Sequence, residues 1–229
     1  MKPGGREAMK ISRTKRTAPD RETPKKRFTV AIFGSARIKE RDPIYRQVYR
    51  LGKAIGSRGL DVVTGGGPGI MDAANKGHHE GRRDRHVLSV GLNIILPQEQ
   101  TPNKHLDIKK EFHRFSARLD TFMLLANVVV VTPGGVGTLL EFLYAWQLIQ
   151  VREIADLPVI LMGDMWKDLM GWVKHWPLRR RLLSPSDLDS LFLVRDNSEA
   201  IKIIEAAHQA YARGKKPSCR ELKEKLGYA

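Results

Sequence analysis

The sequence has only one cysteine, Cys219, in 229 residues. A single cysteine cannot form an internal disulfide or build a cysteine-rich zinc site, which excludes a disulfide scaffold and a zinc finger. Long apolar runs are also missing, since the valines at 128–131 fall far short of the roughly 20 apolar residues that span a bilayer. The basic N-terminal stretch lacks the apolar segment of a secretory signal. We therefore expect a soluble cytoplasmic protein without a membrane contact.

Acidic residues are few compared with basic ones. The chain has 25 Asp and Glu against 40 Lys and Arg, a net charge of +15. Residues 1–27 carry +7 of this excess, residues 213–229 carry +4, and the long middle carries the remaining +4. We expect a basic, disordered tail over 1–27 and a basic tail or short helix over 213–229. The N-terminal tail has no aromatic side chain for stacking, so we do not expect nucleic acid as a partner except through these tails.

Between the two ends, β-rich apolar runs alternate with helical patterns. Strands are expected at 28–33, 60–64, 127–132, 158–162 and 191–194, with a further strand inside 87–96. Helices are expected at 43–59, 70–79, 116–126, 138–150, 166–175 and 198–212, and residues 98–115 are expected to form a loop with a short irregular element. This alternation predicts a single α/β domain over 28–212, a doubly wound, mostly parallel sheet with helices on both faces. Such sheets bind ligands beyond the carboxyl ends of their strands, where the strand order reverses.

Three glycine-containing turns fall at the ends of expected strands. They are Gly34-Ser35, residues 65–69 and residues 134–137. Glycine lets the backbone approach a ligand closely, and a helix that follows offers its free N–H groups to a phosphate. The second turn lacks the spacing of a G-x-G-x-x-G fingerprint and the Lys-Ser/Thr of a P-loop. A plain strand-to-helix turn remains the alternative there.

The third turn leads into side chains that can do chemistry. Thr138 can cap the next helix or hold a phosphate oxygen, and Glu141 lies one helical turn further on. The alternative for Glu141 is a capping-box acid that reaches back to the Thr138 backbone. Arg118, near the start of the preceding expected helix, suits a phosphate or a purine edge, and a surface arginine is its alternative.

Taken together and in order, these motifs resemble the Lonely Guy family, which is often labelled lysine decarboxylase. The family hallmark P-G-G-x-G-T-x-x-E is matched in full at 133–141, and related stretches occur at 34–37, 65–71 and 91–103. The resemblance covers roughly residues 28–175. It implies a Rossmann-like fold, a homodimer or larger assembly of dimers, and a phosphoribohydrolase. Such an enzyme cleaves the N-glycosidic bond of a nucleoside 5′-monophosphate, here AMP or a cytokinin riboside monophosphate.

The resemblance implies that Glu141 and Arg118 are the catalytic pair and that no metal or organic cofactor is needed. Two positions depart from the family: Leu119 stands where lysine is common, and Leu140 where many members carry a second acid. A non-catalytic carrier of a nucleotide or phosphorylated cofactor, such as molybdenum cofactor, is the alternative on the same fold. The residues expected to line the nucleotide and phosphate site are Gly34, Ser35, Gly66, Gly67, Gly69, Met71, Pro133, Gly134, Gly135, Gly137 and Thr138.

The chemistry of the expected reaction assigns roles to the pair. Cleavage of a ribosyl bond develops positive charge on the sugar, which a fixed carboxylate stabilises while it orients the attacking water. We assign this role to Glu141. Arg118 either stabilises the departing base or grips the phosphate, and the sequence leaves both open.

Histidines and tryptophans supply the remaining candidates. His78 and His79 are expected to be a solvated pair, without the further ligands that a metal site needs. Trp166, Trp172 and Trp176 are expected in packing or at a dimer surface rather than as a stacking platform.

Overall fold

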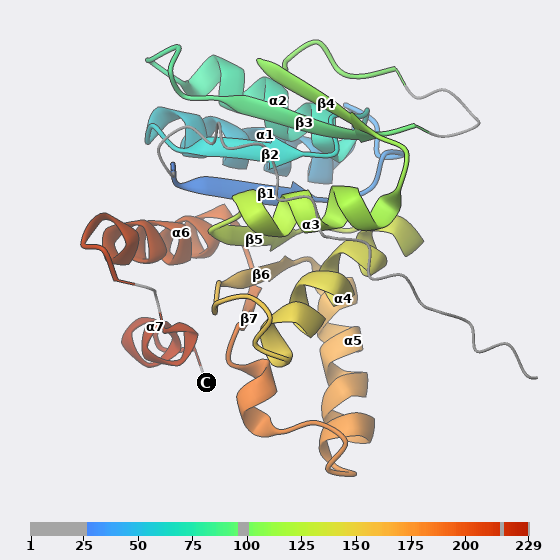
Figure 1. The fold of residues 1–229 in the computed structure, drawn as a ribbon, viewed down its shortest axis with the longest axis vertical. Coiled ribbons are helices and arrows are strands. Elements are labelled where there is room, and N and C mark those ends of the chain that lie inside the picture. The colour runs from blue at the N-terminus through green and yellow to red at the C-terminus, as the bar shows by residue number, and fades with distance from the viewer. Residues whose placement is uncertain (1–26, 96–100, 216–217, 229) are drawn as a thin grey trace, which may run out of the picture.

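The computed structural model describes residues 27–95, 101–215 and 218–228, and the expected tail at 1–27 lies almost wholly outside them. Its centre is a seven-stranded, all-parallel sheet in the order β4-β3-β2-β1-β5-β6-β7 (Figure 1). Helices cover both faces, so the expected doubly wound α/β fold is confirmed. The strands are β1 Thr29–Phe33, β2 Asp61–Thr64, β3 Ser89–Ile94, β4 Ile108–Phe112, β5 Val128–Val131, β6 Val159–Met162 and β7 Leu191–Val194. The helices are α1 Pro43–Ser57, α2 Ile70–Gly81, α3 Phe115–Leu125, α4 Val136–Gln150, α5 Asp164–Val173, α6 Asn197–Ala212 and α7 Cys219–Leu226, with a π-helix η1 at Lys174–Leu178 and a 3-10 helix η2 at Pro185–Leu188.

The central strands are buried throughout and mostly apolar because both faces of the sheet are covered. On β1, Val30 and Ile32 join a core with α1, α2, α6 and α7, whereas Ala31 and Phe33 join a core with α3, α4 and α5. Alternate residues of a strand point to opposite faces, so one short run supplies both cores. No helix in the described ranges is long and apolar enough to cross a membrane.

Helix α1 follows directly from its sequence. The Asp42 carboxylate accepts a hydrogen bond from the Ile44 amide at 2.8 Å, and Pro43 occupies the first turn, where its missing N–H costs nothing.

Glycines then bring α1 against α2. A β-carbon on Gly52 would lie 2.3 Å from the Ala74 carbonyl oxygen, so the two backbones touch without intervening side chains. This contact fixes the position of α2, whose N-terminus follows the second glycine turn.

Strand β4 corrects the expected loop at 98–115. It pairs in parallel with β3, Gly91 opposite Lys109, yet four of its five residues are exposed. Its sequence, Ile-Lys-Lys-Glu-Phe, lacks the alternation of a half-buried strand because this edge strand buries only Phe112. Backbone pairing with β3 therefore forms the strand, and the side-chain pattern does not reveal it.

His78 is not solvated as expected: its side chain is fully buried, whereas His79 is exposed. The Nε2 atom of His78 lies 2.9 Å from the Leu60 carbonyl oxygen and Nδ1 has no partner. The carbonyl can only accept, so Nε2 carries the proton and the ring is neutral. Burial lowers the pKa of His78 from 6.5 to about 4.

This buried ring predicts an acid-sensitive fold. The unfolded chain binds a proton at His78 below pH 6.5 and the folded chain only near pH 4, so stability falls as the pH drops through this window. The loss at pH 5 is about 2 kcal/mol on the scale of 1.36 kcal/mol per pKa unit. Urea unfolding at pH 7 and pH 5 should show a weaker pH dependence in His78→Gln than in the parent chain. The exposed neighbour supplies the control, His79→Gln. Equal pH dependence in all three proteins would contradict the assignment.

Candidate active site

The candidate site begins where β1 and β5 lie side by side at the middle of the sheet (Figure 1). The chain leaves β1 toward β2 and leaves β5 toward β6, so the strand order reverses here. The Thr132 hydroxyl donates to the Phe33 carbonyl oxygen at 2.9 Å, and the Ser35 amide donates to the Pro133 carbonyl oxygen at 3.1 Å. These bonds hold the first and third glycine turns together at the carboxyl ends of the two strands, where ligands of such sheets bind.

The second glycine turn packs against the first. The Ile70 amide donates to the Ser35 carbonyl oxygen at 3.0 Å, and a β-carbon on Gly69 would lie only 2.5 Å from that oxygen. Gly66 and Gly69 both have positive φ, 70° and 69°, a conformation that favours glycine. On the first turn, a β-carbon on Gly34 would lie 2.2 Å from the Thr132 hydroxyl. The three predicted turns therefore meet, and only glycine allows them to come this close.

Helix α4 starts two residues earlier than expected. Its N-cap is Gly135, which has no side chain to cap it, so Thr138 is the third residue of the helix and not its cap. Thr138 is buried, and its hydroxyl packs so closely on Gly134 that a β-carbon there would lie 2.1 Å from the hydroxyl oxygen. Gly135 and Gly137 are exposed, and a β-carbon on either would meet no atom within 4 Å. The uncapped first-turn N–H groups of α4 thus border open space, where a helix end attracts anions.

Arg118 and Glu141 form a buried ion pair. Nη1 of Arg118, on α3, lies 3.0 Å from Oε1 of Glu141, on α4, with side-chain exposures of 8% and 12%. The Nε atom of Arg118 donates to the Leu92 carbonyl oxygen at 2.7 Å, and its guanidinium lies 5.1 Å from the centre of the Phe122 ring. Both alternatives are wrong: Arg118 is not a surface side chain, and Glu141 does not cap its own helix.

Two opposing effects set the charge state of Glu141. Burial raises the pKa of the Glu141 carboxyl, while the nearby Arg118 guanidinium lowers it by charge attraction and by the hydrogen bond. Burial dominates, so the pKa of Glu141 lies above its ordinary value. A carboxylate of this kind is a stronger base than one in water, and Arg118 still keeps it in place.

The remaining predicted residues line the same region. Gly66 and Gly67 are buried, and their carbonyl oxygens accept hydrogen bonds from Asn103. The backbone amide of Asn103 donates to Gly66 O at 2.8 Å, and its side-chain nitrogen donates to Gly67 O at 3.0 Å. The Met71 sulfur lies so close to Gly65 that a β-carbon on Gly65 would be only 2.6 Å from it. The second glycine turn therefore lies directly against both the Arg118 guanidinium and the Met71 sulfur.

Several of the residues that build this site were missed as site residues. A β-carbon on Gly65 would lie 2.4 Å from Nη2 of Arg118, so Gly65 makes room for the guanidinium. Asn93 is buried beside Gly66, and its carboxamide oxygen has no partner in the described structure. Asn103 orders the glycine turn as described above. All three lie inside motifs noted in the sequence, but only their spatial neighbours show what they do.

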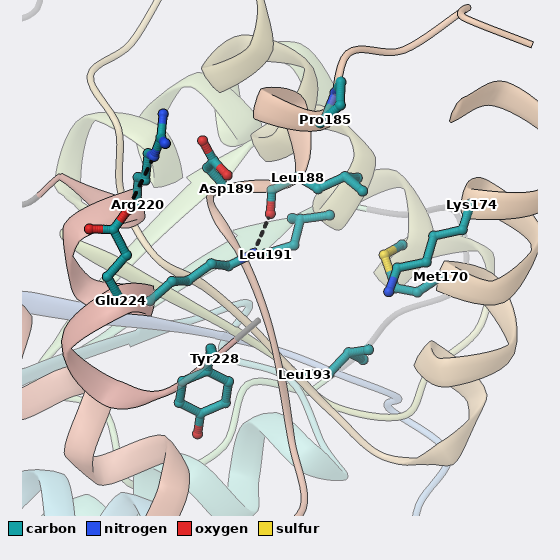
Figure 2. A pocket seen from close by; sticks show the side chains of 11 residues that line it. Met170, Lys174, Pro185, Leu188, Asp189, Leu191, Leu193, Arg220, Glu224 and Tyr228 are labelled. Carbon is teal, nitrogen blue, oxygen red and sulfur yellow. Dashed lines mark hydrogen bonds and ion pairs between the residues drawn. The ribbon is translucent and has the colours of Figure 1, made fainter. Parts of the chain in front are cut away.

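Of two hollows, one lies away from this constellation and the other borders it at Gly69 and Asn103. A cavity of about 430 Å³ lies along the outer edge of β7, between α5 and α7, and none of the predicted site residues lines it (Figure 2). Lys223, one of its lining residues, donates to the Leu188 carbonyl oxygen at 2.7 Å. A second hollow of about 330 Å³ opens beside Gly69 and is lined by Tyr45 and Asp72, whose side chains are hydrogen bonded at 2.5 Å. Within the described ranges, no three His, Cys, Asp or Glu side chains are grouped to hold a metal ion.

The sheet topology and the glycine turns at its switch point place the chain in the class of Rossmann-like α/β proteins. Residues 71–204, more than half of the chain, match the family model described as "Possible lysine decarboxylase". The chain belongs to this family, which confirms the resemblance found in its motifs.

Curated relatives carry hydrolase names. The pyrimidine/purine nucleotide 5′-monophosphate nucleosidase of Escherichia coli K12 is 32% identical over 160 residues, 64% of this chain and 34% of that protein. The cytokinin riboside 5′-monophosphate phosphoribohydrolase LOG of Oryza sativa is 35% identical over 96 residues, 41% of this chain and 38% of that protein. The chain thus spans little more than a third of the length of these relatives.

Solved structures share the fold. TM1055, a structural genomics target, is 25% identical with a TM-score of 0.58, and the match covers 78% of this chain and 99% of that one. The molybdenum cofactor binding protein of Rippkaea orientalis is 19% identical with a TM-score of 0.60, covering 80% of this chain and 98% of that one. At this identity the second match shows the fold alone.

The buried pair predicts a pH-dependent stability defect. Arg118→Met leaves the Glu141 carboxylate without its cation, which costs about 3 kcal/mol at pH 7 if the carboxylate stays charged. Its pKa then rises further, so the defect shrinks as the pH falls and the carboxyl becomes neutral. Urea unfolding of the single variant and of Arg118→Met/Glu141→Gln tests this. The double variant should be the more stable of the two at pH 7; a double variant that is less stable than the single one would contradict the coupling.

Proposed function

We propose that this protein is a phosphoribohydrolase that hydrolyses a nucleoside 5′-monophosphate, such as AMP or a cytokinin riboside monophosphate, to the free base and ribose 5-phosphate. One observation carries the proposal. A buried carboxylate, Glu141, held by Arg118, lies on the helix whose uncapped, exposed N-terminus follows the third glycine turn. The names of the E. coli and rice relatives support the same reaction.

The helix sets the distance between the two ends of the substrate. Glu141 is the sixth residue of α4, so it lies about 7.5 Å along the axis from Val136 at a rise of 1.5 Å per residue. A 5′-phosphate at the first-turn N–H groups, near Gly135 and Gly137, leaves the ribose to extend along the helix. The anomeric carbon then comes to the Glu141 carboxylate. Arg118, bonded to this carboxylate, belongs at the base end and not at the phosphate.

The proposed reaction needs only water and the substrate. The bond from the anomeric carbon to the base nitrogen breaks, and positive charge grows on the ribose, where the Glu141 carboxylate stabilises it. Water adds to the anomeric carbon and gives up a proton, for which Glu141 is the base. The departing base leaves with the bonding electron pair, and the Arg118 guanidinium stabilises its negative charge. The base then takes up the proton that Glu141 removed from the water, which restores the Glu141 carboxylate.

A homodimer is part of the proposal. Val136, Leu140 and Leu143 follow one face of α4 at helical spacing and are 83%, 44% and 46% exposed. Phe115 and Leu124 of α3 add exposed apolar surface. An apolar stripe of this kind marks an interaction surface, and it lies on the helix that carries Glu141, so a second copy would border the crevice. We also place the protein in the cytoplasm, in keeping with its free, buried Cys219.

A base-release assay tests the activity. The purified protein is incubated with AMP, GMP, CMP, UMP and isopentenyladenosine monophosphate, and the free base is quantified by chromatography. We expect release from at least one monophosphate and a loss of about 100-fold or more in Glu141→Gln, because the base for water and the charge opposite the sugar are both removed.

The matched control is Glu153→Gln, which removes an exposed carboxylate just beyond the end of α4 and should leave the rate unchanged. Release that persists in Glu141→Gln would overturn the assigned role. No release from any monophosphate, with AMP still raising the melting temperature, would favour the carrier function instead.

The apolar stripe predicts a dimer that a single charge disrupts. Leu143→Glu places a carboxylate in the centre of the proposed interface, and its burial there is unfavourable. The molar mass measured by size-exclusion chromatography coupled to light scattering should fall from that of two chains to that of one. Val151→Glu, at the C-cap of the same helix and 58% exposed, should remain a dimer. A parent chain that elutes as a monomer would contradict the interface.

A further inference from the structure

A second surface lies on the segment after β6, which we call the tryptophan arm (residues 169–186). It contains the end of α5, the π-helix η1 and the start of η2, and extends beyond the sheet at the bottom of Figure 1. Trp166, just before the arm, is fully buried as expected of a packing residue. Trp172 and Trp176, four residues apart, are instead 55% and 45% exposed.

The arm carries positive charge without compensation. Its 18 residues include four cations, Lys174 and the arginines at 179–181, and no Asp or Glu. None of these four forms an ion pair within the described structure. Of the acids that flank the arm, Asp187 is engaged, since its carboxylate accepts the Ser184 amide at 2.8 Å. An occupant of this surface must therefore bring negative charge.

One of the cations, Arg180, forms a single surface with the rings of His175 and Trp176. The Arg180 guanidinium lies 5.0 Å from the centre of the Trp176 ring, and the His175 ring packs edge-on against it at 4.9 Å. The turn that holds Arg180 in place is closed by backbone bonds: Arg180 donates to Trp176 O at 3.2 Å and Leu182 to Pro177 O at 2.8 Å. Arg181 has a φ of 58°, a strained conformation for a residue other than glycine. The Arg180 guanidinium and the Trp176 ring are thus held against each other before any partner arrives.

We propose that the tryptophan arm binds single-stranded nucleic acid, with unpaired bases stacking on Trp172 and Trp176 and phosphates contacting Lys174 and the arginines at 179–181. Exposed aromatic rings among cations are the elements from which sequence-tolerant single-strand sites are built, because every base offers a flat face. A duplex would not expose these faces. The site is independent of the expected basic tail and of the Arg118–Glu141 pair.

Two other occupants fit less well. In a symmetric contact with a second copy, the arm would meet itself and oppose four cations to four cations. An anionic bilayer calls for an apolar helix face with the cations on the opposite face. Here His175 and Arg180 lie directly on the Trp176 ring, so the cationic and aromatic groups share one face.

The test is a titration of fluorescein-labelled 12-nucleotide oligouridylate with the full chain, followed by anisotropy at several salt concentrations. We expect Trp172→Ala and Trp176→Ala each to weaken binding by about tenfold with little change in the salt slope, because each removes stacking and not a phosphate contact. Arg179→Ala should reduce the slope by about one. Circular dichroism and base release should match the parent chain in all variants.

Controls separate the arm from general charge effects. Leu182→Ala removes an apolar side chain of the arm that is 73% exposed but cannot stack on a base, and this variant should bind as the parent does. Arg83→Ala removes an exposed arginine after α2 and should change no more than the salt slope. Heparin, a polyanion without bases, should bind the tryptophan variants and the parent equally. Unchanged RNA binding in both tryptophan variants, or tryptophan-dependent binding to phosphatidylserine vesicles in place of RNA, would overturn the proposal.

Discussion

The ion pair between Arg118 and Glu141 is the interaction on which the site depends. A carboxylate with most of its surface buried is unfavourable unless a cation and hydrogen bonds compensate it. Arg118 provides this compensation because the Leu92 carbonyl and the Phe122 ring hold its guanidinium in one orientation. The pair therefore links β3, α3 and α4, and the register of the sheet decides whether the charges meet. A shift of β3 by one residue would direct a different carbonyl at the arginine.

Small residues provide the space in which this pair and its crevice exist. Gly65 leaves room for the guanidinium, and Gly34 and Gly69 allow the first two turns to touch. The same device joins α1 to α2 through Gly52, which positions the start of α2 beside the crevice. A side chain at these positions would separate the loops, whereas Gly135 and Gly137 face open space and are free to approach a ligand. Glycine thus has two roles here, close packing inside and open backbone at the surface.

Much of this arrangement could be predicted from the sequence, and the exceptions share a physical cause. The buried strands were predicted because both of their faces are apolar, Glu141 because it lies in the P-G-G-x-G-T-x-x-E motif, and Arg118 because the family resemblance pairs that acid with an upstream arginine. Strand β4 was missed because an exposed edge strand has no apolar pattern, and its pairing is made by backbone groups. His78 was wrongly expected to be solvated because its side chain is polar, although it lies on the buried side of α2 with Ala74. The carbonyls of Leu92, Gly66 and Gly67 that accept from Arg118 and Asn103 are backbone groups, whose partners cannot be predicted from the residue type.

The electrostatics of the crevice favour hydrolysis over carriage. A carrier of a phosphorylated cofactor needs the N–H groups at the start of α4, and a buried anion one turn further on would only weaken its hold on another anion. Glu141 is nevertheless present, at the energetic cost of burial and with an arginine dedicated to it. Such a carboxylate becomes stabilising when positive charge develops next to it, which happens at the ribose as the glycosidic bond breaks. The interaction that is unfavourable in the resting protein is therefore favourable in the transition state of the proposed reaction.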